Sequence, residues 1–109
     1  MKVLFSPDVR LYFQDLIEIL LEKEYFGLEE TAVKYVRSLF YAISDNLPKT
    51  LKRKAPPHFD RYGIDMYYAV FKKNRNTSWY VFFNHYDEEG EIVYFVRYVS
   101  NNHMIAQYL

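Results

Sequence analysis

Residues 77–100 read TSWYVFFNHYDEEGEIVYFVRYVS. Aromatic and β-branched residues alternate along two runs separated by Asp87–Gly90, which is the pattern of a β-hairpin. Both faces of both strands are mostly apolar, so we expect an antiparallel sheet covered on both faces, by helices or by a partner. Strict alternation places Arg97 on the same face as Phe95 and Val99. A guanidinium among such neighbours needs an anion, a carboxylate or water.

Two amphipathic helices are predicted upstream of this hairpin. Ser6, Pro7 and Asp8 supply an N-cap, a proline at the first helical position and an acid in the first turn, and the apolar stripe continues to about Lys23. A break at residues 24–27, where a glycine can end the helix, precedes a second apolar series over residues 28–47. The short loop implies an antiparallel helical hairpin laid on the sheet.

The remaining segments complete an α+β fold. Residues 2–5 form a short strand, residues 49–61 stay extended and non-helical because of two prolines, and residues 64–72 form a strand that leads into the central hairpin. Residues 101–103 can cap a final helical turn. We expect an N-terminal strand and a helical hairpin packed on a mostly antiparallel sheet of three to four strands, with a short C-terminal helical tail.

Composition limits the class of protein. The 109 residues are 50% hydrophobic and 20% aromatic, which predicts one domain over residues 1–109. The absence of cysteine excludes disulfides and thiolate chemistry, and no apolar run predicts a signal peptide or a membrane span, so we expect a cytoplasmic protein without a membrane partner. The net charge of zero argues against binding to nucleic acid by electrostatics alone.

Positive charge gathers in one third of the chain. Residues 31–64 hold seven bases and two acids, and the basic side chains of its second half are Lys49, Lys52, Arg53, Lys54 and Arg61. Closely spaced lysine and arginine side chains can contact phosphate, and crowding lowers the pKa of a lysine towards the range needed for proton transfer. The alternative is a solvated loop.

Two single residues outside this segment are candidates for chemistry. Arg97 can clamp a phosphate or a transition state from a rigid strand, or form an ion pair with Asp60, Asp65 or a helix acid. His103 can act as a general acid or base, or as a cap. The three histidines are dispersed without clustered acids, so we expect no metal, and no known motif predicts a cofactor.

The order of elements, the KTLKRK run at residues 49–54 and the final VYFVRYVSNNHMIAQYL at residues 93–109 resemble the RelE/ParE superfamily of bacterial toxins. These toxins belong to type II toxin–antitoxin modules. The resemblance implies a protein antitoxin whose flexible segment wraps the toxin. It further implies an mRNA-cleaving site in RelE-like members and DNA gyrase as the target in ParE-like members.

The resemblance also assigns residues. Arg97 matches the strand arginine of the ribonucleases, Lys52 and Lys54 match their basic residues, and Tyr108 matches loosely. Residues 66–70 read MYYAV and carry no base where ribonuclease members tend to have a second arginine. If the chain cuts RNA, we expect a catalytic set of Arg97, Lys52, Lys54 and His103. We expect target or phosphate contacts from Lys49, Arg53, Arg61 and Tyr108.

The missing second arginine favours a toxin that binds its target over one that cuts RNA. The antitoxin is the expected partner, and RNA on the ribosome or DNA gyrase the expected target. We expect the antitoxin to cover the apolar surface of the sheet. Without antitoxin, the same surface could bind a second copy of the chain, so we expect a homodimer. A non-catalytic interaction module on the same fold is the alternative from a different class.

Overall fold

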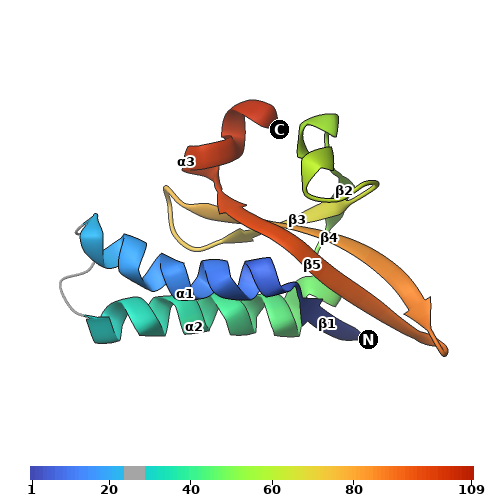
Figure 1. The fold of residues 1–109 in the computed structure, drawn as a ribbon, viewed down its shortest axis with the longest axis horizontal. Helices are drawn as coiled ribbons and strands as arrows, with labels where there is room; N and C mark the ends of the chain where they lie inside the picture. Colours follow the sequence, from blue (N-terminus) through green and yellow to red (C-terminus); the bar gives the residue numbers. More distant parts are fainter. Residues whose placement is uncertain (24–28) are drawn as a thin grey trace.

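A computed structural model describes residues 1–23 and 29–109 and confirms the α+β class (Figure 1). The elements in chain order are β1 (Lys2–Phe5), α1 (Pro7–Glu22), α2 (Glu29–Asn46), η1 (Leu47–Lys49), β2 (Lys52–Lys54), η2 (Pro57–Arg61), β3 (Tyr67–Lys72), β4 (Ser78–Glu88), β5 (Glu91–Asn101), α3 (Asn102–Ile105) and η3 (Ala106–Tyr108). In the described part of the chain, no helix is long and apolar enough to cross a membrane.

The sheet has five strands in the order β1-β5-β4-β3-β2, where three to four were expected. β1 runs parallel to β5, and the other neighbours are antiparallel. The additional strand is β2, a three-residue segment that pairs with β3 inside a region predicted to be only extended. The helical hairpin lies along one face of this sheet (Figure 1).

The first helix begins and ends close to its predicted bounds. The Ser6 side chain accepts a hydrogen bond from the backbone N–H of Val9 at 3.2 Å, which is the predicted N-cap. The buried side chains of α1 form one stripe, namely Val9, Phe13, Leu16 and Leu20. The predicted break at residues 24–27, including its glycine, lies outside the described residues.

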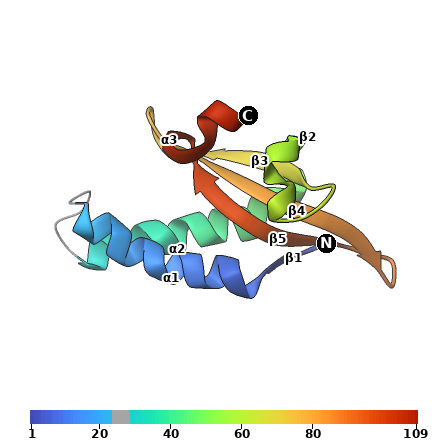
Figure 2. The ribbon, with the colours of Figure 1, turned by 45° about the horizontal axis from the view of Figure 1, so that its top comes forward.

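The second face of the sheet is covered by the chain itself. Phe59 of η2, Ile105 of α3, Met66 and Phe82 form a separate buried cluster on this face. Figure 2 shows η2 and the C-terminal turns on the side of the sheet away from the helical hairpin. Residues 57–61 form the 3₁₀ helix η2, so the prediction that all of residues 49–61 are non-helical is wrong for this part. A proline is tolerated in the first turn of a helix, so Pro57 does not prevent η2 from forming.

A β-bulge changes the facing of the last strand. The β4–β5 register pairs Phe82 with Tyr98 but Phe83 with Val96, so one extra residue stands in β5. Val96 and Val99 therefore both pack in the cluster beneath the helices, whereas Tyr98 packs on the second face. The predicted sharing of a face by Arg97 and Val99 is wrong for this reason.

Turn residues set the remaining strand ends. Glu89 and Gly90 have φ of 52° and 85°, as a two-residue hairpin turn of type I′ requires, and this confirms the predicted turn. Asp65 has φ of 56°, which interrupts extended backbone. β3 therefore begins at Tyr67 rather than at the predicted Ile64.

Candidate functional site

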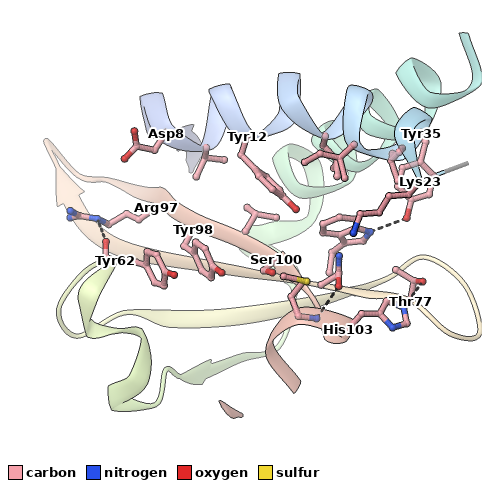
Figure 3. Close-up of a pocket in the computed structure, with 18 of the residues that line it drawn as sticks. Asp8, Tyr12, Lys23, Tyr35, Tyr62, Thr77, Arg97, Tyr98, Ser100 and His103 are labelled. Atoms are coloured by element: carbon pink, nitrogen blue, oxygen red, sulfur yellow. Dashed lines mark hydrogen bonds between the residues drawn. The ribbon is translucent and has the colours of Figure 1, made fainter. Parts of the chain in front are cut away.

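A groove with a volume of about 730 Å³ lies between α1 and the second half of β5 (Figure 3). Pairing of β1 with β5 ends at Val96, so no strand among the described residues borders Arg97–Asn101 on that side. α1 lies along this edge instead. One face of α1 lines the groove, and the C-cap residue Lys23 continues this lining. The α1 residues are Asp8, Val9, Tyr12, Leu16, Ile19 and Leu20.

Phenol groups occupy the inside of the groove. Trp79 Nε1 donates a hydrogen bond of 2.9 Å to the Tyr35 hydroxyl at one end (Figure 3). Burial, with smaller contributions from Tyr98 and Tyr35, raises the pKa of Tyr12 to about 12. Burial also raises the pKa of Tyr98, beside the Ser100 hydroxyl. The phenols of Tyr12 and Tyr98 therefore stay protonated near neutral pH.

Tyr12 should lose its phenol proton well above the ordinary pKa of a tyrosine. A raised pKa means that the native state keeps the phenol proton between pH 10, the ordinary value, and about 12, whereas the unfolded state loses it. Its contribution to stability is complete below pH 10 and is lost as the pH rises through 12. Tyrosinate absorbance should show a step near pH 12 that Tyr12→Phe removes. An unchanged profile in Tyr12→Phe would mean that another phenol causes the step.

Arg97 lies at the edge of the groove and forms no ion pair with any carboxylate that the structure describes. Its Nε donates to the Tyr62 carbonyl at 3.1 Å, and one terminal nitrogen donates to Asn84 Oδ1 at 3.4 Å. Among the described residues, no carboxylate comes within 4.0 Å of it, so the ion pair with Asp60 or Asp65 is absent. The side chain is exposed and held by neutral acceptors. It is therefore an anion-binding candidate with a fixed direction.

Gly63 leaves the space in which the Arg97 stem lies. A Cβ at this position would lie 2.9 Å from Met66 Sδ and 3.0 Å from both Cδ and Nε of Arg97. Gly63→Ala should therefore push the guanidinium away from the Tyr62 carbonyl and lower the unfolding free energy by about 1–3 kcal/mol. Denaturant unfolding and the NMR signal of the Arg97 Nε–H measure the two effects.

Repeating Gly63→Ala in an Arg97→Ala protein shows whether contacts with Arg97 cause the loss of stability. In an Arg97→Ala protein, two of the three close contacts of the new Cβ are gone, so Gly63→Ala should cost less there. If Gly63→Ala lowers the unfolding free energy equally in both proteins, Gly63 is needed for its backbone conformation or for the contact with Met66, and not for Arg97.

The structure does not bring the predicted lysines to Arg97. Lys52 Nζ donates to the carbonyls of Pro48 and Thr50 and lies 5.3 Å from the centre of the Tyr94 ring, in the cluster beneath the helices. Burial lowers its pKa. Lys54 is paired with Tyr67 of β3 and lies two residues after Lys52 in β2. Because alternate residues of a strand share a face, Lys54 projects from the same face of the sheet as Lys52. Arg97 bonds to Tyr62, which packs on the opposite face.

The remaining predicted residues are spread over the molecule. Lys49 is exposed at the end of η1. Arg53 lines a smaller hollow with Tyr68 and Leu109, and Arg61 lies close enough to Tyr98 to influence its pKa. The Tyr108 ring stacks on His58 at 3.7 Å, and His103 Nε2 lies 3.3 Å from the Thr77 hydroxyl in the groove wall. Only Arg97 and His103 of the predicted catalytic set line the same groove.

Several residues of the site were not predicted. Asn84 and Tyr62 hold the guanidinium, and Tyr12 and Ser100 supply hydroxyls inside the groove. Asn84 had a visible signal, because it is an amide directly after the apolar run of residues 79–83. Tyr12 and Ser100 had none, since only the packing of α1 beside β5 gives them a common cavity.

Comparison with known proteins finds no matching protein-family model, no matching curated protein and no matching solved structure. The groove, Arg97 and the fold are therefore the features that bear on function.

Proposed function

We propose that this chain is the toxin of a type II toxin–antitoxin module, arresting bacterial growth through its target and neutralised in the cytoplasm by a protein antitoxin. The observation that carries the proposal is the apolar groove along the full length of α1, with an exposed arginine at its edge. Extended apolar hollows of this kind mark protein interaction sites. A helical hairpin on an antiparallel sheet, with an arginine on the last strand, is also the arrangement that the resemblance to RelE/ParE toxins implies.

Binding of a target suits the site better than cleavage of RNA. Cleavage by the adjacent 2′-hydroxyl needs a proton acceptor, stabilisation of the phosphorane and a proton donor to the leaving oxygen. Lys52 and Lys54 project from the face opposite to Arg97, and Lys52 is held by two carbonyls. Arg97 alone supplies stabilisation without proton transfer. Its free donors suit an anionic group on either target class, RNA on the ribosome or DNA gyrase.

Inducing the chain in bacteria, with and without the small gene next to it, tests the proposal. We expect growth arrest from the chain alone, and relief of the arrest together with co-purification when the neighbouring product is present. No arrest in any host would contradict the toxin proposal and favour the alternative, an interaction module that uses the groove only for binding. Cleavage of mRNA by the purified protein would instead favour the ribonuclease alternative.

A further inference from the structure

We infer that the groove takes a peptide segment with an apolar centre and an acidic residue near each end. This inference rests on the proposed function, since the antitoxin is the protein that would supply the segment. It names the chemistry of the partner, which the proposed function leaves open.

The length of the groove favours a chain segment over a small molecule. Its α1 lining extends from Asp8 to Lys23, fifteen residues apart, which is about 22 Å at the rise of an α-helix. Figure 3 shows Asp8 and Arg97 at one end and Lys23 near the other. An extended peptide covers this distance in about seven residues. A ligand with a single anionic group would engage one end only.

The middle of the groove is apolar and closed to strand pairing. Leu16 and Leu20 of α1 line it together with Val99 and Trp79 of the sheet, and all four belong to the buried cluster beneath the helices. Val99 and Ser100 are only 3% and 5% exposed, so α1 already covers the open edge of β5. The segment should therefore bind by laying its apolar side chains in the groove over the contact between α1 and β5, rather than by extending the sheet.

The charges at the two ends select the partner. Neither Lys23 nor Arg97 has a carboxylate within 4.0 Å among the described residues, and His103 adds a titratable group to the β5 side of the groove. Asp8 is the one acid among the described residues that line the groove, and it opposes the binding of an acid at the Arg97 end. The lining thus carries two lysine or arginine charges against one aspartate, which complements an acidic segment.

Two synthetic peptides of equal length test the inference. Both carry the same leucine-rich centre spanning the groove, and one has glutamates at its ends where the other has lysines. We expect the glutamate peptide to bind at least tenfold more tightly at low salt, with shifted NMR signals from α1 and from Val99. Lys23→Ala and Arg97→Ala should each weaken it about two- to fivefold, as for partly exposed ion pairs. Asp8→Asn should strengthen it.

Ile19→Glu and Leu11→Glu provide a matched pair of control variants on α1. Ile19 lines the groove, whereas Leu11 is 56% exposed and lies outside it, so only the first should reduce binding, by at least tenfold. Equal or tighter binding of the lysine peptide, equal effects of the two variants, or no binding of the glutamate peptide would overturn the inference. So would self-association of the protein through the groove. If growth arrest and rescue occur while the peptides fail, only this inference is lost, because the toxin proposal is tested independently.

Discussion

Arg97→Ala should abolish growth arrest while leaving the protein folded. The side chain is exposed, and its bonds to the Tyr62 carbonyl and Asn84 involve neutral partners, so no buried charge is left unpaired when it is removed. We expect an unfolding free energy lower by only about 1–2 kcal/mol. As the proposed anchor for an anionic group of the target, Arg97 should contribute at least about 2 kcal/mol, so the affinity for the target should fall about 30-fold or more.

Two variants control this result. Arg97→Lys keeps the charge but loses the forked donors, and it should recover only part of the activity. Arg37→Ala removes an exposed arginine of α2 that does not line the groove, and it should leave growth arrest unchanged. Unfolding of Arg97→Ala would show a structural role. If the Arg97→Ala protein is folded and fully toxic, Arg97 is not part of the functional site.

Phe59→Ala should lower the unfolding free energy by about 3–5 kcal/mol. Phe59 is 1% exposed, and its ring stacks on Phe82 with ring centres 4.3 Å apart, beneath η2. This phenylalanine closes the second face of the sheet, which the sequence predicted to be covered by helices or by a partner. Denaturant unfolding measures the loss directly.

Ile64→Ala is the control, because Ile64 lies between η2 and β3 and is 64% exposed. It should change the unfolding free energy by less than about 0.5 kcal/mol. If Phe59→Ala were equally mild, η2 would not be a fixed cover of the sheet, and the second face would be open to a partner.

The elements with strong periodicity were predictable from the sequence. The stripe of α1, its Ser6 cap and the hairpin turn at Glu89 and Gly90 follow from local rules, namely helical spacing, capping chemistry and positive φ. These rules act over a few residues and do not depend on the partners of each strand. The fold class follows from their order.

The site depended on features without a local signal. The bulge in β5 places Val99 and Arg97 on opposite faces of the sheet. An alternating apolar sequence contains no signal for the extra residue of a bulge. The separation of Lys52 from Arg97 depends on strand order, because β3 and β4 lie between their strands. The groove itself exists only because β1 is too short to border the whole of β5. Each of these is a long-range property of the sheet.

The proposed occupation of the groove by an antitoxin is tested most directly by calorimetric titration of the neighbouring gene's product into three purified proteins. We expect tight binding to the wild type and to Leu11→Glu, and at least about 100-fold weaker binding to Ile19→Glu, because a carboxylate would then be buried against the apolar segment of the partner. Equal affinity for all three proteins would contradict the assignment of the groove as the antitoxin site.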